Sequence, residues 1–153
     1  MTLSPDSNTL DGQLGYLGLR LTMGVNILVH GAGRIFGSGA ADFATTTAGQ
    51  FSNTPLPAGL VHAFLLIVSF AELVLGMLLT LGLLSRWALM LGSLLIGALV
   101  FGTALRADWN TVGVQMVYAI IYYVLLLNRS DNRFSLDALN FARNARRSRE
   151  SIL

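Results

Sequence analysis

Polar and ionisable side chains recur at helical spacing inside three of the most apolar stretches of the chain. In each stretch they fall on one face of a helix, within an arc of about 120° or less. These polar stripes consist of Arg20, Asn26, His30 and Arg34 in the first stretch, His62, Ser69, Glu72 and Thr80 in the second, and Thr111, Gln115, Tyr118 and Tyr122 in the third. Side chains of these types donate hydrogen bonds, hold ion pairs or carry protons, so the stripes are the candidate functional surfaces.

One part of the stripes is typical of a ligand site. His30, Arg34 and His62 are expected to meet at one depth, and two imidazoles beside an arginine are uncommon in hydrocarbon without a function. Gln115 and Tyr118 are expected to join them from the third stretch. The alternative is that these side chains only pack helices together, and for the tyrosine this alternative is favoured.

A second part of the stripes is expected to form a buried ion pair or a proton path. It consists of Arg20, Asn26, Glu72 and Tyr122. We expect Arg20 to pair with Glu72, because a charge at mid-membrane costs at least about 2.5–3.5 kcal/mol and therefore needs a partner. A purely structural ion pair that fixes the bundle is an equal alternative.

The elements that position these residues are predicted from hydropathy. The chain has 153 residues, of which 54% are hydrophobic and 12% charged, and a mean hydropathy of +0.63. Apolar runs near the ~20 residues that a helix needs to cross a bilayer are found at 14–36, 60–84, 87–105 and 111–127. The predicted fold is therefore an all-α integral membrane four-helix bundle with a polar interior stripe.

The predicted organisation has three parts: a short polar N-terminal segment at 1–13, a four-transmembrane-helix domain at 14–128 and a basic amphipathic tail at 129–153. The connector at 38–59 is long for a bundle, which indicates a lid or a surface helix. All ten basic residues counted as Lys or Arg are arginines, and six follow the last apolar run. The positive-inside rule then predicts that both termini are cytoplasmic. No cleavable signal peptide is expected, because the first thirteen residues lack a basic region.

Composition excludes several kinds of site. The chain contains no cysteine, so it cannot by itself build an iron–sulfur cluster, a thiol relay or a thiolate-bound metal site. No metal site is expected. The basic residues gather in a juxtamembrane tail, where anionic lipid is a nearer partner than nucleic acid.

Three motifs resemble a known family. The segments "LRLTMGVNILVHGAGRIFG", "AELVLGMLLTLGLLSRWALMLG" and "NRFSLDAL" are similar to those of the DoxX family of small four-span bacterial membrane proteins. The resemblance covers about residues 19–139 and implies a four-helix bundle in the bacterial inner membrane. Some members are linked to quinone reduction, as thiosulfate:quinone oxidoreductase subunits are, so the resemblance also implies a quinone-linked role.

Two function classes remain open. The first is a quinone-interacting subunit of a membrane redox system, which would make the protein part of an oxidoreductase. The second is a small-molecule transporter or a non-catalytic membrane assembly subunit that uses the same cavity. A haem held by His30 and His62 is the least favoured cofactor. The lipid bilayer is the expected partner, and a partner redox subunit and a second copy of the chain remain open as others.

Overall fold

The computed structural model describes residues 5–141 and residue 143, with side chains from residue 9 onward. Within this part of the chain every regular element is a helix, which confirms the all-α fold class. The elements are α1 (Pro5–Ala32), the π-helical turn η1 (Gly33–Ser38), α2 (Ala40–Gly49), α3 (Ala58–Leu81), α4 (Ser85–Leu105), α5 (Trp109–Leu127) and the 3-10 turn η2 (Arg129–Asp131).

Three of the described helices, α3, α4 and α5, are long and apolar enough to cross a membrane. They match the last three predicted runs, and every helix end lies within three residues of the predicted one. Helix α1 is long enough but not apolar enough to count as a candidate span, because Arg20, Asn26 and His30 interrupt its apolar sequence. Three candidate spans are therefore established, and the predicted four-span bundle is not confirmed.

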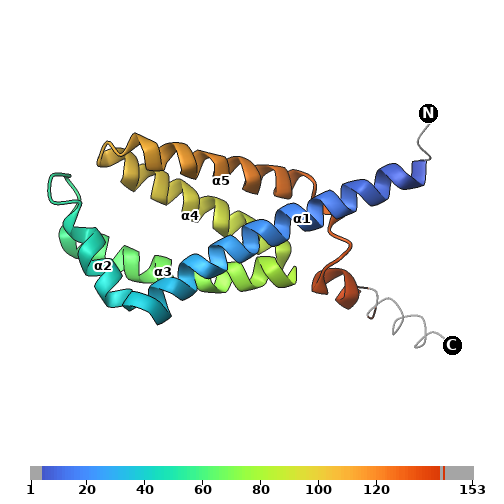
Figure 1. Ribbon diagram of the computed structural model, residues 1–153, viewed down its shortest axis with the longest axis horizontal. Helices are drawn as coiled ribbons and strands as arrows, with labels where there is room; N and C mark the ends of the chain where they lie inside the picture. Colours follow the sequence, from blue (N-terminus) through green and yellow to red (C-terminus); the bar gives the residue numbers. More distant parts are fainter. Residues whose placement is uncertain (1–4, 142, 144–153) are drawn as a thin grey trace.

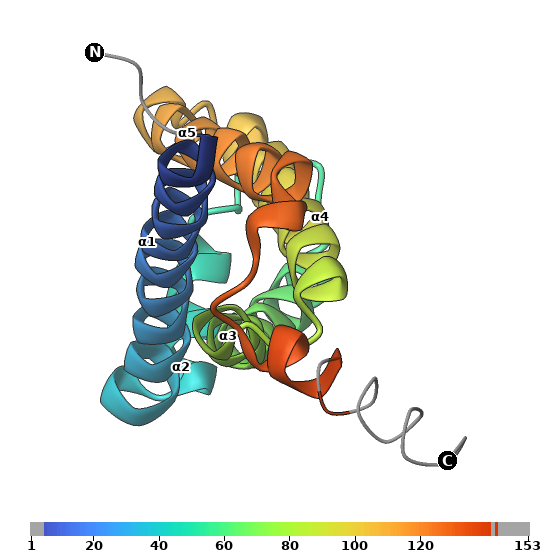
Figure 2. The ribbon, with the colours of Figure 1, turned by 90° about the vertical axis from the view of Figure 1, so that its right-hand side faces the viewer.

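The long helices form two antiparallel pairs. Helix α1 packs along α3, and α4 packs along α5 (Figure 1). Seen after a 90° turn, α1 and α4 lie on opposite sides, with α3 and α5 between them (Figure 2). Helix α2 lies at one end of the molecule, whereas the start of α1 and the segment after α5 lie at the other end (Figure 1). The connector at 38–59 thus contains a short helix, one of its two predicted forms.

Glycine allows α1 and α3 to approach backbone to backbone. A Cβ on Gly31 would collide with the backbone of Leu73, and a Cβ on Gly76 would collide with the backbone of Leu28. Small residues at such seams are typical of membrane helices, because lipid provides no hydrophobic force between helices and close packing must hold them together. The α1–α3 pair is therefore held by a glycine seam.

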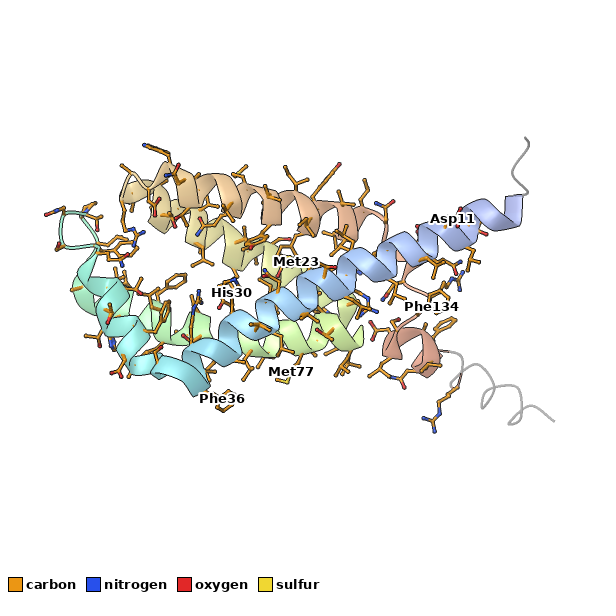
Figure 3. All side chains as sticks on the ribbon, viewed as in Figure 1. Asp11, Met23, His30, Phe36, Met77 and Phe134 are labelled. Atoms are coloured by element: carbon orange, nitrogen blue, oxygen red, sulfur yellow. The ribbon has the colours of Figure 1, made fainter. Side chains whose placement is uncertain are left out.

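The buried apolar residues form two clusters. The larger cluster joins α1, α3, α4 and α5 and contains Tyr16, Met23, Ile27, Leu75, Leu79, Ala88, Leu89, Ile96, Tyr122 and Leu125. The smaller one joins α2 to the start of α3 through Ala44, Val61 and Leu65. Figure 3 shows the contrast: Met23 on α1 is buried, whereas Phe36 on η1 and Met77 on α3 point away from the other helices.

The end opposite α2 is held by the segment after α5. The Asp137 carboxylate accepts hydrogen bonds from the backbone N–H groups of Leu84 and Ser85, each at 2.8 Å. These N–H groups lie in the α3–α4 turn, where Gly82 and Leu84 have left-handed backbone conformations. Within the tail, residues 136–141 are helical, and the positions after 141 lie outside the described residues except for position 143.

Candidate ligand cavity

A cavity of about 390 Å³ lies where α2, α3, α4 and the start of α5 come together, which we call the α2 cavity. Most of its wall is apolar and aromatic. The apolar lining residues are Phe43, Phe51, Leu56, Leu60, Val61, Phe64, Leu65, Val68, Ala98, Leu99, Phe101 and Gly102. Its polar lining residues are Arg34, Thr47, Gln50, Thr103, Arg106, Thr111 and Gln115. An apolar cavity with a few convergent polar groups is the usual form of a small-molecule site.

Arg34 joins three elements at one side of the α2 cavity. It lies on η1, and its Nη1 donates a hydrogen bond to Glu72 Oε2 on α3 within an ion pair. Its guanidinium also lies over the ring of Phe43 on α2, 4.3 Å from the ring centre. The Glu72 side chain is 5% exposed and that of Arg34 22% exposed, so the carboxylate depends on this arginine more than the arginine depends on it.

Arg106, in the α4–α5 turn, contacts an acidic residue and an aromatic ring as Arg34 does. Its guanidinium donates to Gln50 Oε1 and, at 3.1 Å, to Asp108 Oδ2, and it lies 5.0 Å from the centre of the Phe51 ring. Asp108 caps α5 by accepting from the backbone N–H and the hydroxyl of Thr111. The hydrogen bonds from Thr111, and then the one from Arg106, hold the pKa of the Asp108 carboxyl below its usual value. Arg106 thereby ties the C-terminal end of α2 to the start of α5.

Gln115 contributes a polar side chain to the α5 wall of the cavity. Its Nε2 donates to Thr103 Oγ1 at 3.1 Å. Its Oε1 is buried and has no hydrogen-bond partner among the described residues. A buried acceptor without a partner raises the free energy of the folded state.

The expected pairing of Arg20 with Glu72 is wrong. Arg20 is buried, but it donates to the backbone carbonyls of Leu79 and Thr80 at the C-terminal end of α3 and to that of Phe134 in the segment after α5. Its guanidinium lies against Gly82. Arg20 therefore caps the C-terminal end of α3, where carbonyl groups lack helical partners and a cation is favoured.

The helix register explains this correction. The contacts of the glycine seam pair Gly24 with Thr80, Leu28 with Gly76 and Gly31 with Leu73. One further step of the same pairing places Glu72 level with Ala32, two residues from Arg34. Arg20 is 12 residues from Ala32, or about 18 Å along the helix, which is too far for Arg20 to reach Glu72.

The predicted ligand residues do not all meet. Arg34 and Gln115 line the α2 cavity, whereas His30, His62 and Tyr118 do not. His62 lines a separate pocket beside α2, and its Nε2 lies 3.3 Å from Thr45 Oγ1. Tyr118 packs against the larger apolar cluster, as its structural interpretation predicts. His30, on the last turn of α1 (Figure 3), is exposed and close enough to Glu72 for an electrostatic interaction.

The remaining polar residues gather around Glu72 or stand alone. Tyr122 is 1% exposed, interacts electrostatically with Glu72, and has its ring packed against Gly92. The amide nitrogen of Asn26 is buried without a hydrogen-bond partner among the described side chains. Glu72 thus pairs with Arg34 and interacts with the exposed His30 and the buried Tyr122, whereas Arg20 lies at the C-terminal end of α3.

Sequence reasoning missed Phe43, Phe51, Thr103 and Arg106 as cavity residues. A signal was present for the two aromatic residues, Phe43 and Phe51: aromatic side chains in a long polar connector indicate a segment that packs back onto the protein.

Comparison with known proteins agrees with this architecture. The family model described as DoxX matches residues 15–108, which is more than half of the chain. The match begins within α1 and ends at the cap of α5, so it includes the Arg34–Glu72 pair and most of the cavity wall. No curated protein and no solved structure matches the chain. The protein is a multi-pass membrane protein and belongs to the DoxX family.

Proposed function

We propose that the protein is a quinone-binding subunit of a membrane redox system, and that the quinone ring occupies the α2 cavity. The observation that carries this proposal is the form of the cavity. Its volume of about 390 Å³ lies within the range of roughly 300–1,000 Å³ that is usual for small-molecule sites. Its walls are apolar and aromatic, and its polar groups are few.

The wall chemistry suits a flat ring with two oxygen atoms. Phe43, Phe51 and Phe64 offer faces or edges on which an aromatic ring can pack. Arg34 and Arg106 both line the cavity, and a guanidinium has five N–H donors, so each retains donors beyond those used in its present bonds. A ring oxygen near either arginine can therefore be hydrogen-bonded.

An isoprenoid tail needs a path into lipid. Leu60 on α3 and Phe101 on α4 both line the α2 cavity, and both are also exposed on the surface of the protein, at 60% and 61%. The cavity thus reaches an apolar surface between two candidate spans. A ring bound inside can keep its tail in the surrounding hydrocarbon.

The redox partner must come from outside this chain. Because the sequence has no cysteine, thiolate-bound clusters and thiol relays belong to another subunit. We place the protein in the bacterial inner membrane with both termini in the cytoplasm, supported by the arginine-rich C-terminal segment. A C-terminal fusion to a reporter that is active only outside the cytoplasm should then be silent.

The test is to purify the protein in a mild detergent, extract it with organic solvent and quantify the quinone. Wild-type protein is expected to carry quinone or to take it up when a short-chain benzoquinone is added. Gly102→Leu should reduce the bound amount, because the new side chain fills space in the α2 cavity next to Phe51.

Gly97→Leu is the matched control on the same helix, since a side chain there meets open space. It should retain wild-type binding. Wild-type protein that contains no quinone and takes up none would contradict the proposal.

A further inference from the structure

We infer that the α2 cavity has a second opening, which meets water on the side of the membrane opposite the arginine-rich C-terminal segment. Through this opening a bound quinone ring exchanges protons and meets a water-soluble redox partner. The inference rests on the proposed function and deepens it by naming the side of the membrane that serves the site. It follows from the place of the cavity along the spans and from the polarity of its exposed lining.

The α2 cavity reaches one end of the three candidate spans. Its lining includes Leu60 in the first turn of α3, Arg106 at the C-terminal cap of α4 and Thr111 in the first turn of α5. Helix α5 then runs to the other end of the molecule, where the arginine-rich segment follows it (Figure 1). The cavity opening and that segment therefore belong to opposite sides of the membrane.

At this end the cavity lining is polar and reaches the protein surface. Gln50 and Thr111 both line the cavity and are both exposed. Arg106, which donates to Gln50, lies in the same wall. Trp109 is exposed beside them, and exposed tryptophan is typical of the boundary between membrane and water. Gln50, Arg106 and Thr111 thus form an opening at this boundary, which we call the polar mouth.

The polar mouth has a different task from the apolar opening at Leu60 and Phe101. A quinone takes up one proton for each electron when it becomes a quinol, and here the redox partner supplies the electrons. Protons and hydrated molecules need a path that avoids hydrocarbon, because a charge is costly there. The polar mouth offers this path. With the arginine-rich segment in the cytoplasm, it faces the outside of the cell.

The test uses the absence of cysteine from the chain, because each introduced cysteine is then the only thiol. A membrane-impermeant maleimide reacts with a thiolate, which forms where water reaches the sulfur. In spheroplasts it should label Gln50→Cys at the polar mouth. Asn140→Cys, in the segment after α5, should be labelled only in inside-out vesicles. Leu94→Cys, exposed in the middle of α4, should be labelled in neither.

A ligand then tests whether the polar mouth leads to the quinone. The probe is a fully substituted decyl-benzoquinone, which does not add to thiols. At about ten times its dissociation constant it fills about nine-tenths of the sites, so labelling of Gln50→Cys should slow about tenfold. Thr47→Cys, another lining position, should be slowed as well. Thr46→Cys, on the adjacent and exposed position outside the lining, is the matched control and should keep its rate.

Three results would overturn this inference while the proposed function stands. The first is that neither Gln50→Cys nor Thr47→Cys is labelled from either side. The second is that they are labelled from the same side as Asn140→Cys. The third is that the quinone binds, as measured by solvent extraction, but slows neither lining variant more than Thr46→Cys. Failure of wild-type protein to bind any quinone would overturn the proposed function and this inference together.

Discussion

The Arg34–Glu72 ion pair should be the most sensitive electrostatic contact in the interior of the bundle. It links η1 to α3, next to the α2 cavity, and the Glu72 side chain is only 5% exposed. Replacing Arg34 by Leu leaves this carboxylate buried without its cation. Replacing both residues by Leu removes both charges together.

The expected magnitudes follow from the burial of each partner. Removing one member of a buried pair usually costs about 3–5 kcal/mol, and Arg34→Leu should fall in this range because the stranded Glu72 has little access to solvent. Glu72→Leu should cost less, about 1–3 kcal/mol, because Arg34 is 22% exposed and keeps its contact with the Phe43 ring. The double variant should be more stable than Arg34→Leu alone, because apolar pairs often replace buried ion pairs at little cost.

The assay is equilibrium unfolding of the three variants in mixed micelles, analysed as a double-mutant cycle. A coupling free energy of at least about 1.5 kcal/mol between positions 34 and 72 is expected. Arg20→Leu should show no coupling with Glu72→Leu, because Arg20 lies at the other end of α3. Coupling of Glu72 to Arg20 instead of Arg34 would refute the helix register described above.

Three further predictions concern the framework. Gly31→Ala should lower the free energy of unfolding by about 1–3 kcal/mol, because its Cβ meets the Leu73 backbone, whereas Gly97→Ala, which meets open space, should not destabilise; equal effects in the same unfolding assay would argue against the seam. Asp137→Ala should cost about 1 kcal/mol by leaving the N–H groups of Leu84 and Ser85 without their acceptors, whereas Asn140→Ala should be neutral. Limited proteolysis of the α3–α4 turn should become faster in Asp137→Ala and not in Asn140→Ala. The folded-state pKa of Asp108 is lowered, so its contribution to stability should be complete above the unfolded pKa of about 4 and lost as the pH falls through the folded pKa. Asp108→Asn should therefore destabilise the protein at pH 7 and much less near pH 2. An equal loss of stability at both pH values would contradict the cap.

Hydropathy predicted the spans well because it depends on local sequence. The ends of α3, α4 and α5 were found within a few residues, since charged residues and turn residues mark where an apolar run stops. Helix α1 shows the limit of the method. The polar residues that make it functionally interesting also lower its hydropathy, so its assignment as a fourth span stays a prediction.

Helical periodicity predicted which face of each helix turns inward, but not how far one helix is shifted along the axis of its neighbour. It placed Glu72 and Arg34 on inward faces, but it could not set the axial position of α1 against α3. That position is set by the contacts of Gly24, Gly31 and Gly76, which depend on three-dimensional packing. The expected Arg20–Glu72 pair failed for this reason, by a shift of about two helical turns.

The α2 cavity was predicted in part. Gln115 and Arg34 were identified from their stripes, because both are polar residues at helical spacing in apolar surroundings. The placement of His62 was missed because it depends on α2, which covers the start of α3 and offers Thr45 as a neighbour. No pattern in the sequence fixes how a connector helix folds back onto a bundle.

The most direct test of the central claim is photolabelling of the protein in membranes with an azido-benzoquinone, followed by mass spectrometry of its peptides. The account predicts labelling of residues 98–115, which form the α4 and α5 wall of the α2 cavity, and loss of this label when unlabelled quinol is added in excess. It also predicts weaker labelling in Gly102→Leu and unchanged labelling in Gly97→Leu. Label that is spread over the lipid-facing surfaces of α4 and α5, and that excess quinol does not displace, would contradict a quinone site in this cavity.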